Sequence, residues 1–173
     1  LVDALISDDG TIWLATLAGG LVKISNEEYT TFNIGNSNIS DDRLSSLAND
    51  NLGGIWIGTE SKGLSHFDGE NWTTYKTDNS NLCNNNIKDI AVDSSNILWV
   101  CTAHGMSRFD GEHWASYLTY NSELPSNVIT AVAIYTFQNI WVGTDAGLAK
   151  FDRTNWTSYT TENSELPSNI IKT

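Results

Sequence analysis

The strongest constraint on this chain is a sequence module of 42 to 43 residues that occurs four times. Each copy carries a Trp preceded by an aliphatic residue, and successive Trp residues lie 43, 43 and 42 positions apart. The four are Trp13, Trp56, Trp99 and Trp141. A Gly followed by Leu or Met comes six or seven residues after each of them. A period of this length predicts a repeat architecture in which each unit packs against its neighbours.

Two further landmarks keep the same phase. The first is Phe-Asp-Gly-Glu-Asn-Trp at 67–72, which is echoed at 109–114 and 151–156, while Tyr29 replaces the Trp in the first unit. The second is an Asn-Ser pair that begins at Asn36, Asn79, Asn121 and Asn163. Because the phase hardly drifts, strands and turns assigned in one unit apply to all four.

Each unit contains four short strand-like stretches, which in the third unit are 87–92, 97–102, 106–109 and 114–118. The intervening residues 93–96 and Asp110-Gly111 are typical of turns, and the second pair predicts a two-residue hairpin. No stretch has the apolar spacing that a helix requires over ten or more residues. We therefore expect antiparallel sheets and almost no helix.

Four short antiparallel strands in a unit of this length are typical of a propeller blade. Residues 55–58 are apolar on both sides of the pleat, which indicates a sheet covered on both faces. We predict an all-β β-propeller with four tandem four-stranded antiparallel blades, at approximately 1–43, 44–86, 87–128 and 129–173. The residue two after each repeat Trp is small, so a neighbouring blade or a Trp ring should press close there. Those residues are Ala15, Gly58, Cys101 and Gly143.

The two ends of the chain fall at the same phase of the repeat, since residues 1–3 correspond to 171–173. We interpret the chain as an arc of a larger propeller, or as half of a ring that two copies complete. Repeats need neighbours to bury their faces. Adjoining propeller blades or a second copy of the chain are therefore expected partners.

Composition excludes some classes of partner. With nine Lys and Arg against 21 Asp and Glu, the net charge is −12. This charge repels nucleic acid and anionic membrane surfaces. No segment is apolar for long enough to span a bilayer, so we expect no membrane contact by this segment. The two cysteines, Cys83 and Cys101, make neither a disulfide framework nor a metal motif, and we expect no metal and no cofactor.

These motifs resemble the two-component regulator propeller repeat over the whole chain. The resemblance is carried by Gly-Ile-Trp-Ile-Gly-Thr at 54–59, Gly-Leu at 63–64, Phe-Asp-Gly at 67–69, Trp-Thr-Thr-Tyr at 72–75 and Asn-Ser-Glu-Leu-Pro-Ser-Asn-Ile at 163–170. Residues 23–26 and 81–84 depart from the pattern. The resemblance implies a periplasmic or extracellular sensor region of a hybrid histidine kinase, in a family where sugars are common ligands.

The face that gathers the loops between blades and the loops between the second and third strands is the expected binding face. The Asn-Ser pairs on it recur in every unit, which favours a structural duty such as capping a turn. Residues that do not recur are better candidates for ligand contacts, because a scaffold role should repeat. We name Glu60, Lys62, His104 and Asp145.

The tryptophans are assigned to packing. The four central ones, Trp13, Trp56, Trp99 and Trp141, are expected in the core. Those on the outermost strands, Trp72, Trp114 and Trp156, could stack on sugars, but their periodicity favours a packing role.

Nothing in the sequence predicts catalysis. The three histidines, at 66, 104 and 113, are scattered and form no paired motif with an acid, a base or a nucleophile. We therefore expect a non-catalytic sensor or ligand-binding module for a small polar ligand or carbohydrate. The alternative is a structural or adhesion repeat that makes protein contacts at the cell surface. A propeller lyase or hydrolase would require His, Arg and acidic residues clustered around the axis.

Overall fold

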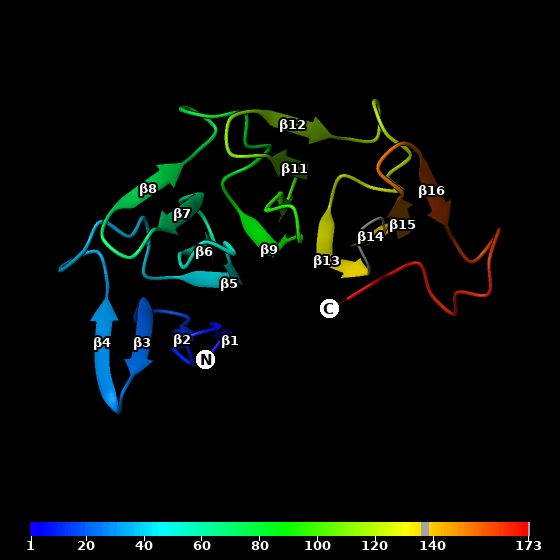
Figure 1. Cartoon of the computed structure of the whole chain (residues 1–173). Helices are drawn as coiled ribbons and strands as arrows, with labels where there is room; N and C mark the ends of the chain where they lie inside the picture. The colour runs from blue at the N-terminus through cyan, green and yellow to red at the C-terminus, as the bar shows by residue number, and fades with distance from the viewer. Residues whose placement is uncertain (136–138, 173) are drawn as a thin grey trace.

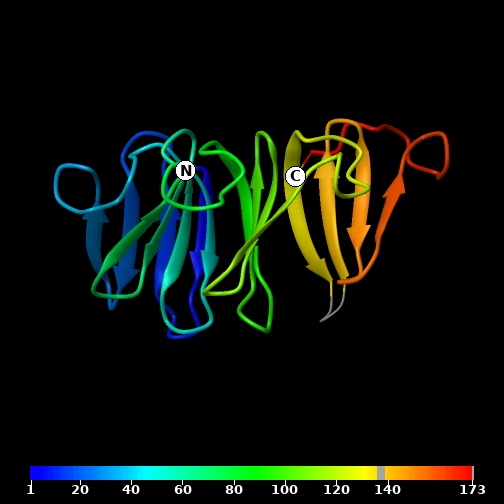
Figure 2. The same ribbon diagram turned by 90° about the horizontal axis from the view of Figure 1, so that it is seen from above.

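The computed structural model describes residues 1–135 and 139–172, which form strands and connecting loops without any helix. The strands make four separate four-stranded sheets, arranged as an open arc (Figure 1). Seen at right angles to that view, the sheets stand side by side (Figure 2). The expected all-β propeller architecture is confirmed. Within the described residues, no helix has the length and apolar character needed to cross a membrane.

Each sheet contains four strands that follow one another in the sequence and pair antiparallel. Sheet 1 comprises β1 (Asp3–Ile6), β2 (Ile12–Ala15), β3 (Leu21–Ser25) and β4 (Glu28–Phe32). Sheet 2 comprises β5 (Leu44–Asn49), β6 (Ile55–Thr59), β7 (Leu64–Phe67) and β8 (Trp72–Tyr75). Sheet 3 comprises β9 (Ile87–Val92), β10 (Leu98–Thr102), β11 (Gly105–Phe109) and β12 (Trp114–Tyr117). Sheet 4 comprises β13 (Ile129–Tyr135), β14 (Asn139–Thr144), β15 (Gly147–Phe151) and β16 (Trp156–Tyr159).

The first strand of each sheet lies on the concave side of the arc, and the fourth lies on its convex rim (Figure 1). Thus β5 contacts both β1 and β9, and β9 contacts β13. Polar side chains link these inner strands by hydrogen bonds. The Asp3 carboxylate accepts a hydrogen bond from the Leu47 N–H, and the Asp89 carboxylate accepts one from the Val132 N–H. Asp89 also accepts from the Ser46 hydroxyl. Burial raises the pKa of the Asp89 carboxyl despite these donors.

The apolar core lies between adjacent sheets, in three clusters. At each interface the Trp of one sheet meets the Phe that ends the third strand of the next, as Trp13 does with Phe67 at 6.2 Å between ring centroids. Trp56–Phe109 and Trp99–Phe151 repeat the contact. Such edge-to-face pairs favour one mutual orientation of the two sheets.

The central tryptophans differ in burial. Trp13, Trp56 and Trp99 are 5%, 7% and 0% exposed. Trp141 is half-buried, because it lies on the face of sheet 4 that no other described sheet covers. On the convex rim, three half-buried tryptophans each stack on the Phe that precedes their hairpin. The pairs are Phe67–Trp72, Phe109–Trp114 and Phe151–Trp156.

Small residues do permit a close approach of the next unit. A Cβ on Gly58 would lie 2.7 Å from the Ile87 side chain, and one on Gly143 would lie 2.8 Å from Ile171. The neighbour is therefore an aliphatic side chain, at the start of β9 in one case and after β16 in the other, and not a Trp ring. Cys101 at the same position is fully buried, as expected, and burial raises the pKa of its thiol.

Two local predictions need correction. In sheet 3, β10 begins at Leu98, β11 begins at Gly105 and β12 ends at Tyr117, each one residue away from the expected bound. The turn expected at Asp110-Gly111 is shifted, because the Asp110 N–H donates to the His113 carbonyl and so places Gly111 and Glu112 at the centre. Gly111 has φ 97°, while the Asp110 carboxylate accepts from the N–H groups of Glu112 and His113.

Candidate ligand-binding site

Two sets of loops share one face of the arc, as expected. The connections between sheets hydrogen-bond to the loops between the second and third strands: the Gly20 N–H donates to the Asp42 carbonyl, the Gly63 N–H to Asn85 and the Gly105 N–H to Asn127. We call this surface the loop face. Because each link joins backbone to backbone, the loop face is held rigidly to the sheets.

The recurring Asn-Ser pairs have the structural duty that their periodicity predicted. In the connection after β8, the Asn79 Oδ1 accepts from the Lys76 N–H while its Nδ2 donates to the Thr74 carbonyl. The Ser80 hydroxyl donates back to the Lys76 carbonyl. The same bonds recur at Asn36, Asn121 and Asn163. These side chains replace the missing backbone partners of the turn.

The four residues proposed from sequence occupy equivalent loops of different sheets. Lys62, His104 and Asp145 are exposed, in the β6–β7, β10–β11 and β14–β15 loops. Glu60 is partly buried and forms an ion pair with Arg43, at 2.6 Å between Oε2 and Nη2. Among the described residues, no hydrogen bond or ion pair joins these four to one another. They do not form a single cluster of contacts.

His104 does line a groove at the interface of sheets 2 and 3. The groove has a volume of about 490 Å³, and its walls come from the connection after β8, from β12 and from the start of the next connection. A second hollow of about 730 Å³ continues it along the rim, with Thr77, Ser80, Asn81 and Trp114 lining both. We call the two together the rim groove.

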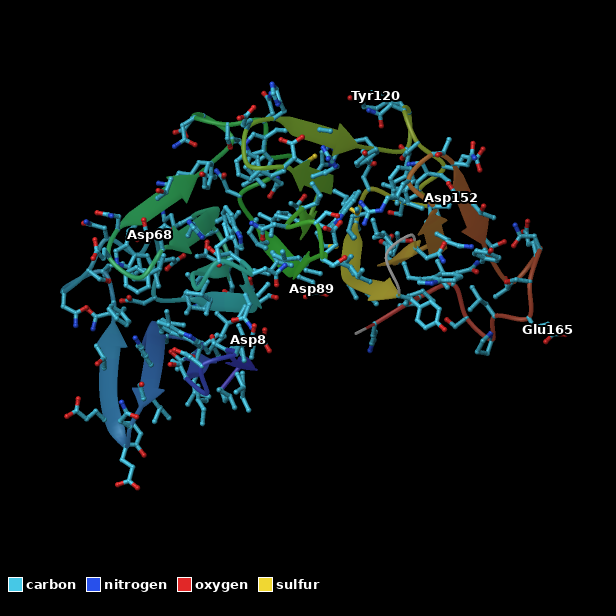
Figure 3. All side chains as sticks on the ribbon, in the orientation of Figure 1. Asp8, Asp68, Asp89, Tyr120, Asp152 and Glu165 are labelled. Carbon is cyan, nitrogen blue, oxygen red and sulfur yellow. The ribbon has the colours of Figure 1, made fainter. Side chains whose placement is uncertain are left out.

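The chemistry of the rim groove is mixed. Its aromatic lining consists of Trp114 in both hollows, Tyr75 and Phe109 in the second, and Tyr120 in the first. Tyr120 is 81% exposed and projects from the convex rim (Figure 3). The second hollow is also lined by Asp78 and Glu112. Flat apolar rings beside amide and carboxylate groups suit a ligand that has both C–H faces and hydroxyl groups.

Two side-chain pairs were missed by the sequence reasoning. The His66 Nε2 lies 2.7 Å from the Asp50 Oδ2, and the His66 ring lies against Trp56 with centroids 4.1 Å apart and the two planes tilted by 32°. The Arg153 Nη2 lies 2.6 Å from the Asp93 Oδ2. Burial raises the pKa of Asp93, but the Arg153 guanidinium and three N–H donors outweigh it and leave the pKa below its ordinary value.

One signal could have revealed these pairs. The residue six positions before each repeat Trp is Ser7, Asp50 or Asp93 in the first three units. It lines the pocket beside Trp13 in the first unit, pairs with a residue of its own sheet in the second and pairs with a residue of the next sheet in the third. A position that changes from Ser to Asp within an otherwise regular repeat marks a place where the units are built differently.

Among the described residues, no hydrogen bonds or ion pairs join an acid, a base and a nucleophile into one group. In the part of the chain that the structure describes, no group of three His, Cys, Asp or Glu side chains could hold a metal ion. The three histidines lie apart: His66 at the interface of sheets 2 and 3, His104 at the rim groove, and His113 in the exposed β11–β12 turn.

One family model matches part of the chain. It is that of the two component regulator propeller and covers residues 81–104, which confirms over those residues the resemblance found in the sequence. A comparison with curated proteins gave no match.

Similar solved structures share the fold. The extracellular domain described as that of the hybrid two component system BT3049 from B. thetaiotaomicron is 21% identical, with a TM-score of 0.87; the match covers 99% of this chain and 24% of that one. The extracellular domain described as that of the one component system BT4673, from the same organism, is 18% identical, with a TM-score of 0.73, over 91% of this chain and 22% of that one. This chain thus spans only part of their length.

An enzyme has the same fold. Virginiamycin B lyase from Staphylococcus aureus is 11% identical, with a TM-score of 0.70, over 90% of this chain and 54% of that one. At such identities the likeness is one of fold. Since the same fold occurs in these extracellular domains and in a lyase, function has to be argued from the site.

Proposed function

We propose that this chain is part of the extracytoplasmic sensor propeller of a two-component signalling protein, and that it binds a small polar ligand without catalysing a reaction. The observation that carries the proposal is the position of the family match. Residues 81–104 include Asn81, Cys83 and His104, which form one side of the rim groove. The extracellular domains that share the fold support a periplasmic or extracellular location.

Carbohydrate is the ligand class that suits the rim groove. Tyr120 offers a ring face to the C–H surfaces of a sugar, beside Trp114, which is itself stacked on Phe109. Asn81 and Glu112 can hydrogen-bond the hydroxyl groups of the sugar. The Asn79 amide is engaged within its own turn and serves as support. The connection after β8 therefore holds the groove in one shape before a ligand arrives, which lowers the entropic cost of binding.

The test is a glycan array followed by calorimetric titration of the best oligosaccharide. We expect binding that Tyr120→Ala weakens severalfold, in line with about 0.5–1.5 kcal/mol for an aromatic contact. His104→Ala should also weaken it. Tyr135→Ala removes a tyrosine that is likewise exposed but lies at the end of β13, and it should leave binding unchanged. Absence of glycan binding, or equal effects of the three substitutions, would contradict the proposal.

A structural or adhesion repeat remains the second candidate, and the uncovered faces of sheets 1 and 4 favour it. On sheet 1, Ile6 is 67% exposed, and on sheet 4 a hollow of about 250 Å³ is lined by Trp141, Leu148, Tyr159 and Leu166. Apolar patches of this kind mark protein contacts. Capture of a defined surface protein that survives the Tyr120→Ala substitution would favour this candidate over ligand sensing.

A further inference from the structure

A pocket that is partly open to solvent lies on the opposite side of the arc from the loop face, between sheets 1 and 2. It has a volume of about 240 Å³ and lies among the β1–β2 turn, the β5–β6 turn and the β7–β8 turn. Its apolar walls are Trp13 and Phe67, and its polar lining includes Ser7, Asp8 and Asn49. Figure 3 shows Asp8 near the concave side of sheet 1. The volume falls below the roughly 300–1,000 Å³ of sites for drug-sized ligands, so only a small molecule would fit.

The repeat supplies a direct comparison, because the interface of sheets 3 and 4 has the same construction. At both interfaces the Trp indole N–H donates to the residue six positions earlier, Trp13 to Ser7 and Trp99 to Asp93. Both Trp rings meet the Phe of the next sheet edge to face.

The two interfaces differ in what fills the space beyond the Trp ring. In sheet 4 the second residue of the outer turn is Arg153, whose guanidinium reaches back across the interface to Asp93. The equivalent residue of sheet 2 is Gly69, which lines the pocket and has no side chain to enter it. A Cβ built on Gly69 would meet nothing within 4 Å.

The intermediate interface is closed in a third way. Gly111 occupies the position of Arg153 in sheet 3, but His66 of sheet 2 pairs with Asp50 and lies tilted against the Trp56 ring. Of the three interfaces in the described chain, only the first therefore has neither a guanidinium nor an imidazole bonded to the residue six positions before its Trp. In its place, Ser7 donates to the Asn49 Oδ1.

The lining of the open pocket favours a cation. The ionisable residues of the lining are Asp8, Asp9 and Lys23, which together carry a net charge of −1. The Lys23 ammonium lies 5.4 Å from the Trp13 ring centroid, a distance at which the face of an aromatic ring attracts a cation. A planar guanidinium can stack on the same ring and donate to oxygen acceptors at the pocket edge.

We propose that the pocket between sheets 1 and 2 binds a small guanidinium compound, whose cationic group takes the place that the Arg153 guanidinium occupies between sheets 3 and 4. The site is separate from the rim groove and does not depend on the proposed sensing of a carbohydrate. The Ser7 hydroxyl and the Asp8 carboxylate act as acceptors, and Trp13 and Phe67 exclude water from the bound group.

The test uses the indole N–H signals of the chain in NMR spectra during titration with agmatine. The Trp13 signal should shift in a saturable way while the Trp99 signal stays in place. The diamine 1,4-diaminobutane, which has the same carbon chain without a guanidinium, should bind at least about tenfold more weakly. Equal binding of the two compounds, or no shift at Trp13, would overturn the proposal.

A second test uses variants in which the residues that differ between the sheet 1–sheet 2 and sheet 3–sheet 4 interfaces are exchanged. Ser7→Asp combined with Gly69→Arg rebuilds the sheet 3–sheet 4 pair inside the pocket and should abolish agmatine binding. Gly111→Arg places the same residue at the same turn position, also at positive φ, beside the interface that His66 fills, and should leave binding intact. Conversely, Arg153→Gly should make the Trp99 signal respond to agmatine, since Asp93 then faces an open pocket.

A single substitution tests the proposal even if the variant with both Ser7→Asp and Gly69→Arg does not fold. Asp8→Asn changes one exposed carboxylate and should weaken agmatine binding severalfold without altering thermal stability. Unchanged affinity in Asp8→Asn, or an Arg153→Gly protein in which Trp99 ignores agmatine, would refute the assignment. Binding of a glycan at the rim groove would be unaffected by any of these changes, so the two proposals fail separately.

Discussion

Single carboxylates determine much of how neighbouring turns and sheets are held. Asp110 has its pKa lowered to about 2, first by the His113 N–H and then by the Glu112 N–H, so it stays ionised in its turn. Asp68 and Asp152 make the same bonds in the turns of sheets 2 and 4. Asp93 differs, because its side chain is fully buried and its partner Arg153 belongs to the next sheet.

Replacing Asp93 by Asn should therefore lower stability in a pH-dependent way. At neutral pH, loss of the buried ion pair should cost about 2–3 kcal/mol. Since the folded-state pKa of Asp93 is depressed, its contribution is complete above its unfolded pKa of about 4 and disappears as pH falls through the lower folded value. Urea unfolding of both proteins at neutral pH and at about pH 2.5 measures the difference between their free energies of unfolding. A gap that stays constant or widens in acid would contradict this account.

At the level of elements, each loop between the second and third strands is built around a glycine. Gly63 has φ 84°, its N–H donates to the Asn85 carbonyl, and its carbonyl accepts from the Thr59 N–H and hydroxyl. Gly20, Gly105 and Gly147 recur at the same position with positive φ. The backbone passes so close to the outermost strand that no side chain fits, and this contact positions the loop face.

Gly63→Ala should accordingly be costly. The new Cβ would overlap the Tyr75 carbonyl oxygen and would also force a positive φ on Ala, so we expect a loss of about 2–4 kcal/mol. Gly53→Ala is the matched control, because Gly53 has φ 100° but a Cβ there would meet nothing within 4 Å. It should lose only about 1 kcal/mol. Equal losses, measured by thermal and urea unfolding, would show that backbone strain alone matters.

For the whole molecule, the decisive feature is that the arc is open. Adjacent sheets bury Trp13, Trp56 and Trp99 between them. The outer faces of sheets 1 and 4, at the two ends of the arc in Figure 1, carry apolar side chains that no other described sheet covers. Repeat architectures gain stability from each interface between neighbours. The partners proposed from the sequence, adjoining blades or a second copy of the chain, would cover these faces.

We therefore expect the isolated chain to self-associate as its concentration rises in sedimentation velocity experiments. Leu148→Lys, within the hollow of sheet 4, should shift the equilibrium toward monomer, because a charge there would be desolvated on contact. Leu52→Lys changes a residue that is 81% exposed in the β5–β6 turn and should have no effect. A chain that stays monomeric at every concentration, or equal responses of the two variants, would exclude association through this face.

How far the sequence could predict the result depends on the range of the interactions involved. The period of the Trp residues, the Asp-Gly turns and the Asn-Ser pairs determined the strands, the sheets and the turn-capping role, because all of these depend on contacts within one unit or on an average over four. The sequence alone also singled out His104, which lies at the rim groove. It did not predict the groove itself.

Only the tertiary structure decided what lies between the sheets. The pairs Asp93–Arg153 and Asp50–His66 join residues 60 and 16 positions apart, and neither recurs in the repeat. The pocket beside Trp13 exists because Ser7 and Gly69, far apart in sequence, both lack the side chain that closes another interface. The features that all copies of a repeat share can be recognised in the sequence. A pocket between two copies depends on residues that differ between them, and the effect of such a difference is visible only in the packed structure.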